Sequence, residues 1–425
     1  HAQLSLVGYG GNQRWDQLAL GCGGELITFN PDMSLSGGPE MVCDVRLSMA
    51  IHGADRNPWV WSDAGWGGDW LTVRRGGAKL TAAAMKVAYL SHGPCLSDVR
   101  YNGYYGSDRA VGLKARIQLP RTDDYGRTYQ HLEYIFHQEL DAADTYLMRR
   151  HPTLWDGSVA YGNAEGLIAE LTMTEGIKQG DLLIPPVKLE GDGPWWIAFP
   201  GRSRREAERD WPIGYVSMVI RDYEHSFGGR VGRHPYLQIR IAEIRDGLAK
   251  LDTRIVPPPA VETYLPGDYV KMDTVWLHFV RNAGEYGGFN EAFRKHLVEH
   301  PRSWKTTFRE VSGNKLSVDI EGGVMLQQMP LVIRADQPGI AFEIRGGGGV
   351  AYVPASFEGI RDPDGYAVYE IIDGVETKLD QSVHGNDFWQ TDFDAGSGTY
   401  SMTFNLPVDG KDSSKWILKK SLYER

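Results

Sequence analysis

The sequence is poor in cysteine, and it has no long hydrophobic run. Its 425 residues include three cysteines, Cys22, Cys43 and Cys95, and no Cys-x-x-Cys pair. A structural zinc site and a thioredoxin-like motif are therefore not expected. Whether Cys22 and Cys43 form a disulfide is left open by their spacing. No apolar run reaches the roughly 18 residues that a membrane-spanning helix needs, so we expect no membrane span.

A basic excess and the common catalytic signatures are also absent. The net charge is −10 and the pI is about 5.7, whereas a general nucleic-acid-binding protein normally carries a basic excess. The sequence has no Gly-x-Ser-x-Gly, no His-Glu-x-x-His and no dinucleotide fingerprint, and the glycine run 346–349 lacks the Lys-Ser/Thr of a P-loop. We therefore expect no nucleic-acid partner, no cofactor and no metal site.

Glycine and short alternating segments are abundant instead. Glycine accounts for 51 residues, and paired glycines separate runs in which apolar and polar residues alternate, a pattern typical of strands joined by tight turns. Two helical patterns are present, over residues 290–299 and 78–90. We predict a mainly β protein with few helices and large, extended sheets. The strands are expected over residues 113–119, 129–140, 215–227, 236–244, 269–280, 315–320, 331–335, 339–344, 366–372 and 399–404.

Aromatic residues form clusters that fit sugar binding. Four tryptophans fall within residues 59–70, and three tyrosines fall within residues 101–105. Indole and phenol rings are flat apolar platforms with a polar edge, and the C–H face of a pyranose ring matches such a platform. The alternative is that these rings pack small cores. The candidate substrate-binding residues are Trp59, Trp61, Trp66, Tyr104, Tyr105 and Arg109.

Two predicted strands carry carboxylates at alternating positions. In residues 215–227 the period of two places Asp222 and Glu224 on the face of Met218 and Ile220, about 7 Å apart along the strand. Two carboxylates that flank a bond with room for a water are what an inverting glycosidase needs. The alternative is an exposed strand end with two solvated acids.

The other strand, 129–140, adds a histidine. His131 and Glu133 should lie on the face opposite Leu132, Tyr134 and Phe136, which we expect to face the core. A histidine beside a carboxylate can share a proton in acid/base catalysis; the alternative is a polar outer face. The candidate catalytic residues are Glu133, Asp222, Glu224 and His131.

The order of these segments resembles carbohydrate-active proteins with a galactose-mutarotase-like β-supersandwich. It is similar in plan to the periplasmic glucan proteins, in which an immunoglobulin-like domain follows the supersandwich. The residues behind the resemblance are the strand 127–136, the stretch 265–270 that enters a strand, and the helix expected near Asn290. No family signature matches, so the resemblance assigns no catalytic residue. It implies a glycan ligand.

Residues after about 302 change to short strands with turn signals such as Asp-Pro-Asp-Gly at 362–365. About 120 residues of this kind have the size of an immunoglobulin-like sandwich. We therefore predict two domains: residues 1–301, a β-supersandwich that holds the glycan site, and residues 302–425, an immunoglobulin-like β-sandwich.

These features together predict a secreted or periplasmic enzyme that cleaves a poly- or oligosaccharide. The acidic pI and plentiful carboxylates favour a glycoside hydrolase that uses carboxylate acid/base catalysis. One alternative is a polysaccharide lyase, with a tyrosine or histidine base and an arginine that neutralises a uronic acid. Another is a non-catalytic glycan-binding protein. The sequence leaves the oligomeric state open.

Overall fold

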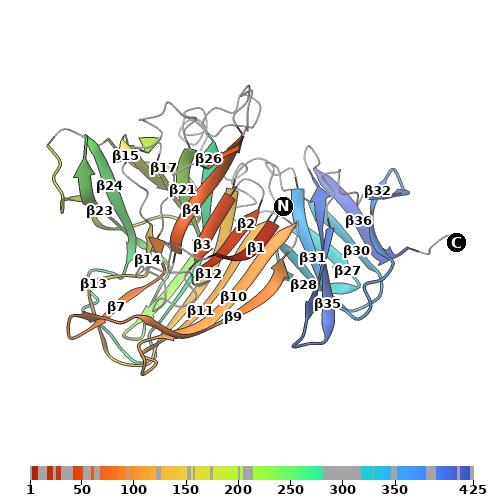
Figure 1. Cartoon of the computed structure of the whole chain (residues 1–425), viewed down its shortest axis with the longest axis horizontal. Helices are drawn as coiled ribbons and strands as arrows, with labels where there is room; N and C mark the ends of the chain where they lie inside the picture. The colour runs from red at the N-terminus through yellow and green to blue at the C-terminus, as the bar shows by residue number, and fades with distance from the viewer. Residues whose placement is uncertain are drawn as a thin grey trace.

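The computed structural model shows a protein built of β-strands (Figure 1). The predicted mainly β class is confirmed, because no helix occurs in the part of the chain that the structure describes. That part accordingly contains no helix long and apolar enough to span a membrane. The described residues are 2–7, 17–22, 25–29, 42–50, 59–61, 68–92, 95–120, 126–150, 155–156, 158–172, 176–199, 202–203, 214–280, 317–328, 330–345, 352–379, 389–408 and 412–421.

A ten-stranded sheet forms the centre of the molecule. Its strand order is β17-β16-β19-β21-β26-β12-β11-β10-β9, and β22 pairs with β21. The strands are β9 (Ala82–His92), β10 (Leu96–Tyr105), β11 (Val111–Pro120), β12 (Gly126–Phe136), β16 (Ser158–Asn163), β17 (Gly166–Thr172), β19 (Trp195–Phe199), β21 (Gly214–Phe227), β22 (Arg230–Gly232) and β26 (Tyr269–Val280).

A twelve-stranded sheet lies against it, with the order β1-β2-β3-β4-β6-β14-β24-β15-β20; β5 pairs with β4, and β23 joins β18 to β24. Its strands are β1 (Ala2–Val7), β2 (Gln17–Cys22), β3 (Glu25–Phe29), β4 (Val42–Ala50), β5 (Trp59–Trp61), β6 (Gly68–Asp69), β14 (Met148–Arg150), β15 (Trp155–Asp156), β18 (Leu182–Lys188), β20 (Arg202–Ser203), β23 (Tyr236–Arg245) and β24 (Leu248–Val256). A four-stranded sheet consists of β25 (Thr263–Tyr264), β13 (Leu140–Tyr146), β7 (Thr72–Arg75) and β8 (Ala78–Lys79).

These three sheets share one hydrophobic core. From β12 the core receives Leu132, Tyr134 and Phe136, none more than 2% exposed, and from β24 it receives Leu251 and Ile255, both fully buried. The predicted alternation along β12 is thereby confirmed. Two large sheets packed around one core form the large β-sandwich that the sequence predicts.

The described residues from 317 to 420 form two five-stranded sheets of their own. One has the order β27-β30-β36-β32-β33 and the other β28-β29-β31-β35-β34. Their strands are β27 (Ser317–Glu321), β28 (Gly323–Gln327), β29 (Leu331–Ala335), β30 (Ile340–Arg345), β31 (Tyr352–Ile360), β32 (Tyr366–Ile372), β33 (Val375–Lys378), β34 (Trp389–Asp394), β35 (Thr399–Pro407) and β36 (Ser413–Lys420). We call this unit the C-terminal sandwich. The predicted domain boundary at residues 301 and 302 lies outside the described residues, so the division stays a prediction.

One helix prediction is wrong, and the other is not addressed. Residues 78–90 form β8 and β9 rather than a helix. The alanines of this segment favour a helix locally. However, β9 pairs antiparallel with β10 from His92↔Ser97 to Ala82↔Tyr105, and such a ladder overrides local propensity. The helix predicted over residues 290–299 lies outside the described residues.

The C-terminal sandwich covers part of the outer face of the ten-stranded sheet, the face turned away from the core. Tyr129, Val219 and Val275 on this outer face belong to the same buried cluster as Phe357 and Phe404 of the sandwich. Figure 1 shows the sandwich, in cyan to blue, at one end of the molecule, and β34 contacts β9. Beside this contact, the outer face carries the polar residues of the pocket described below.

Candidate functional site

A pocket of about 350 Å³ lies on the outer face of the ten-stranded sheet. It contains three of the four candidate catalytic residues, Glu133, Asp222 and His131, and the fourth, Glu224, lies two positions beyond Asp222 on β21. The lining residues are Arg100, Asn102, Lys114, Ala115, Arg116, His131, Leu132, Glu133, Asp222, Lys271, Met272 and Asp273. We call it the sheet pocket.

The strand pairing arranges the charged residues of this pocket in two rows across β10, β11, β12, β26 and β21. The first row is Arg100, Arg116, His131, Asp273 and Asp222. The second row is Asn102, Lys114, Glu133, Lys271 and Glu224. Directly opposed residues have Cβ atoms about 5 Å apart, so neighbours in a row interact. The first row changes from basic to acidic at His131, and the second alternates cations and carboxylates.

His131 lies beside Asp273 of the neighbouring strand, and Asp273 in turn lies beside Arg221. Its Nδ1 lies 3.5 Å from Oδ1 of Asp273, and Nε of Arg221 lies 3.6 Å from the other oxygen of Asp273. Burial lowers the pKa of His131 below its ordinary value; Asp273 raises it, whereas Arg221 and Arg116 lower it further. The imidazole is therefore neutral at pH 7 and able to accept a proton.

A β-bulge at Arg221 decides which way the acids of β21 point. Ile220 pairs with Thr274 and Asp222 pairs with Asp273, so Arg221 is an extra residue in β21. An extra residue shifts the alternation of a strand by one. The expectation that Asp222 and Glu224 share a face with Ile220 is therefore wrong. Ile220 is buried in the core, and the two acids are on the outer face.

The second row is tied together by hydrogen bonds and ion pairs. Nζ of Lys114 donates to Oε1 of Glu133 at 3.3 Å. The hydroxyl of Tyr269 donates to Oε1 of Glu224 at 2.8 Å, and Nε of Arg233 lies 3.5 Å from the other oxygen of Glu224. This hydrogen bond raises the pKa of Tyr269. Both carboxylates thus have fixed partners and a defined orientation.

Arg116, at the basic end of the first row, interacts with an acid of the ten-stranded sheet and with an acid of the C-terminal sandwich. Nε of Arg116 donates to Oδ1 of the buried Asp98 at 3.0 Å, and the amide of Gln118 donates to the other oxygen of Asp98 at 2.9 Å. Burial raises the pKa of Glu358, on β31 of the sandwich, and Arg116 lowers it. Glu358 of the C-terminal sandwich is therefore close enough to Arg116 for the two charges to interact.

The candidate sugar-binding residues are dispersed. Tyr104 lies on the outer face beside His137, with the guanidinium of Arg109 5.1 Å from its ring centre. Tyr105 is fully buried in the core, where burial raises the pKa of its phenol well above the usual value, so it cannot reach the sheet pocket. Trp70, from the same tryptophan cluster, is also core and donates to Gln130 at 2.9 Å.

Three more candidates are not placed by the structure. Trp59 and Trp61 belong to β5, but their side chains lie outside what the structure describes, and so does Trp66. The same holds for the side chains of Cys22 and Cys43, whereas Cys95 is a buried free thiol.

Sequence reasoning named as candidates three of the twelve residues that line the pocket. The pocket residues that it did not name as candidates include Arg100, Lys114, Arg116, Lys271 and Asp273. The signal was present, because each of these is a charged residue at an alternate position of β10, β11 or β26. The pairing of β12 with β26, across more than 130 residues of chain, is not readable from alternation.

Within the described residues no group of three or more His, Cys, Asp or Glu side chains could hold a metal ion. The pocket instead offers a neutral imidazole, carboxylates and fixed cations on rigid strands. Such a set can transfer protons and bind a polar ligand.

Fold and site together define an all-β protein with a polar, charge-lined pocket on the outer face of its largest sandwich. No protein-family model and no curated protein matches the sequence. Solved structures with some likeness include a GH36 α-galactosidase from Geobacillus stearothermophilus, with 11% identity and a TM-score of 0.35. The superposition covers 64% of this chain and 40% of that enzyme.

Two further structures show a similar level of likeness. A GalM/aldose epimerase homologue from C. elegans has 9% identity and a TM-score of 0.28, with 61% of this chain and 97% of that one covered. A putative kojibiose phosphorylase from the human microbiome has 8% identity and a TM-score of 0.28, with 72% and 36% covered. The chain spans about 40% of the length of the α-galactosidases it matches. A likeness of this degree identifies neither a family nor an activity.

Proposed function

We propose that this protein is a carbohydrate-active enzyme that cleaves the glycosidic bonds of a poly- or oligosaccharide in the sheet pocket. The observation that carries the proposal is that β12 and β21, strands separated only by β26, present Glu133 and Asp222 to one pocket together with His131. We further propose a secreted or periplasmic location, and an immunoglobulin-like character for the C-terminal sandwich.

The spacing of the strands suits hydrolysis with inversion. Glu133 and Asp222 lie on strands two apart and in neighbouring rows, so their backbones are roughly 12 Å apart. The carboxyl groups of inverting glycosidases are roughly 6.5–9.5 Å apart, which leaves room for a water. A Glu133 side chain that leans toward β26 can bring the two carboxyl groups to that separation.

Each of the three acids is given a role in this mechanism. Glu133 lines the pocket beside Lys114, with which it forms an ion pair, and we assign it as the base that takes a proton from the attacking water. Asp222 lies across β26 from Glu133, directly opposite Asp273, and we assign it as the acid that protonates the leaving oxygen. Glu224, at the end of the second row, is assigned to orient the sugar.

A second candidate function is a polysaccharide lyase, favoured by the neutral His131. A lyase removes the proton at C5 of a uronate and expels the oxygen at C4, which leaves a C4–C5 double bond. His131 would take the proton, Asp273 would stabilise the imidazolium that forms, and Arg100 or Arg116 would neutralise the uronate carboxylate. Tyr105 has no part in this alternative because it is buried.

The test incubates the protein with a panel of neutral and uronate-containing polysaccharides, and follows reducing ends and ultraviolet absorbance together. New reducing ends without absorbance support the hydrolase, and both signals together support the lyase. If neither signal appears while the panel contains a glycan that the protein binds, the enzymatic proposal fails in favour of a glycan-binding protein.

Variants then connect the activity to the pocket. Glu133→Gln and Asp222→Asn should each reduce hydrolysis at least about 100-fold, since general acid/base catalysis contributes on that order. Glu165→Gln is the matched control, because Glu165 is exposed in the turn between β16 and β17, outside the pocket. For the lyase, His131→Gln should be the damaging change while Asp222→Asn has a small effect. Equal activity of all variants would place catalysis elsewhere.

A further inference from the structure

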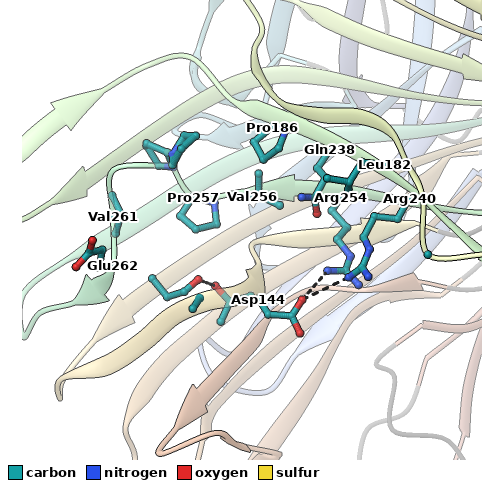
Figure 2. Close-up of a pocket in the computed structure, with 16 residues that line it drawn as sticks. Asp144, Leu182, Pro186, Gln238, Arg240, Arg254, Val256, Pro257, Val261 and Glu262 are labelled. Carbon is teal, nitrogen blue, oxygen red and sulfur yellow. Dashed lines mark hydrogen bonds and ion pairs between the residues drawn. The ribbon is translucent and has the colours of Figure 1, made fainter.

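A second pocket, of about 650 Å³, lies where β13, β18, β23 and β24 meet. Figure 2 shows its residues, with Arg240, Arg254 and Asp144 at one end and Glu262 at the other. It shares no lining residue with the sheet pocket. We call it the arginine pocket. Its volume is within the range of small-molecule sites, about 300–1,000 Å³.

Positive charge exceeds negative charge at the arginine end. A single carboxylate, Asp144, faces three guanidinium groups, those of Arg254, Arg240 and Arg74 at 3.4, 3.5 and 3.7 Å. Arg254 is further engaged by Asp252, which accepts hydrogen bonds of 2.9 and 2.6 Å from its Nε and Nη2. A guanidinium has five N–H donors; those of Arg254 are shared between Asp144 and Asp252, whereas Arg240 shares Asp144 with two other arginines.

Arg240 is the group that is open to a ligand. Its side chain lines the pocket and is 36% exposed, and among the described residues Asp144 is its one polar partner. Arg254 is only 12% exposed and its guanidinium also lies over the ring of Tyr146. Arg254 is therefore held in place, whereas Arg240 is the more exposed guanidinium of the pocket.

Asp144 adopts an unusual backbone conformation at this point. Its φ is 53°, in the left-handed region, which L-residues rarely occupy although aspartate tolerates it better than most. The register of β13 with β7 is irregular between Asp141 and Tyr146. This local irregularity places the Asp144 carboxylate, 61% exposed, against the arginines. It partly neutralises them, and it would repel an incoming anion.

The rest of the pocket wall is mainly apolar. Beside the polar Thr145, Gln238 and Glu262, it includes Leu182, Pro186, Val256, Pro257, Pro258, Pro259 and Val261. Among the described residues that line it, none is aromatic, so it lacks the flat platform on which a sugar face stacks. Aliphatic surface favours an apolar body through the hydrophobic effect.

We propose that the arginine pocket binds a small carboxylate ligand with an aliphatic body, whose carboxylate pairs with Arg240. The aliphatic part lies along the proline wall, and the negatively charged Glu262 at the far end fixes the orientation of the ligand. The site is separate from the glycan site and does not depend on the proposed enzymatic function.

The test measures binding of hexanoate to the full chain by isothermal titration calorimetry, with hexanamide and inorganic phosphate as comparison probes. Hexanoate should bind, and hexanamide, which has the same body without the charge, should bind at least about tenfold more weakly, the factor expected when a charged hydrogen bond is lost. Equal binding of hexanoate and hexanamide would overturn the proposal, and tighter binding of phosphate would overturn the carboxylate assignment.

Two variants should change the affinity in opposite directions. Arg240→Gln should weaken hexanoate binding about tenfold, because it removes the charged partner. Asp144→Asn should strengthen it several-fold, because asparagine keeps the backbone conformation and removes the competing carboxylate. The matched control is Arg245→Gln, on the same strand, where Arg245 pairs with Glu243 outside the pocket. Unchanged affinity in Arg240→Gln, with a thermal midpoint like that of the wild type, would overturn the proposal.

Discussion

The imidazole of His131 and the carboxylate of Asp273 are directly opposed on β12 and β26, with Nδ1 and Oδ1 3.5 Å apart. Burial, which disfavours the charged imidazolium, outweighs this carboxylate, so the pKa of His131 is below its ordinary value. The charged groups around the ring are Asp273, Arg221, Arg116 and Asp98. Two of the following predictions depend on the balance among them.

The lowered pKa of His131 should make the fold less stable in weak acid. As the pH falls below about 6.5, the unfolded chain takes up a proton at this residue before the folded chain does, so the free energy of unfolding decreases. In His131→Gln this part of the decrease should be absent. Urea unfolding at pH 7.5 and 5.5 measures it, with His137→Gln as the control. An identical pH dependence in wild type and His131→Gln would contradict the lowered pKa.

If neutral His131 acts in catalysis, the acidic limb of the pH–rate profile should report its pKa. Asp273→Asn removes the larger of the two charges that raise this pKa, so the limb should move to lower pH. Arg221→Gln removes a group that lowers it, so the limb should move to higher pH. The profile of kcat/KM against pH is the measurement. A limb that stays in place in both variants would mean that another group sets it.

Asp98 should be among the costliest side chains to remove. It is buried and accepts hydrogen bonds from Arg116 and Gln118. Asp98→Ala leaves the guanidinium of Arg116, 21% exposed, without its partner, and we expect a loss of about 3 kcal/mol of unfolding free energy. The double variant Asp98→Ala with Arg116→Met should recover part of that loss. Chemical denaturation of the wild type and the two variants checks the loss and its recovery; no recovery would show that the loss does not come from the unpaired charge.

Gln390 should link the C-terminal sandwich to the ten-stranded sheet. Its Oε1 accepts hydrogen bonds from the backbone N–H groups of Cys95 and Leu96 at 2.8 and 2.9 Å, and its Nε2 donates to the Leu96 carbonyl at 3.0 Å. Gln390→Ala leaves these buried groups unpaired, at a cost of about 2 kcal/mol. Hydrogen exchange should show faster exchange at the N–H groups of Cys95 and Leu96. Unchanged exchange there would mean that the sandwich is held without this contact.

The alternation of residues determined much of the fold. It predicted β26, β29 and β32 with their observed bounds, and it placed His131 and Glu133 opposite the core residues of β12. Alternation is a local property, because successive side chains of a strand point to opposite faces whatever the strand pairs with. The class of the protein and two of its pocket residues were therefore contained in the sequence itself.

Tertiary structure decided what local patterns do not encode. The ladder between β9 and β10 made strands of a segment with helical propensity, and the bulge at Arg221 turned Asp222 and Glu224 to the outer face. The pairing of β12 with β26 placed Asp273 beside His131, and core packing buried Tyr105. Each of these results depends on hydrogen bonds and contacts between segments far apart in the chain, and their free energy is gained only when the whole sheet forms.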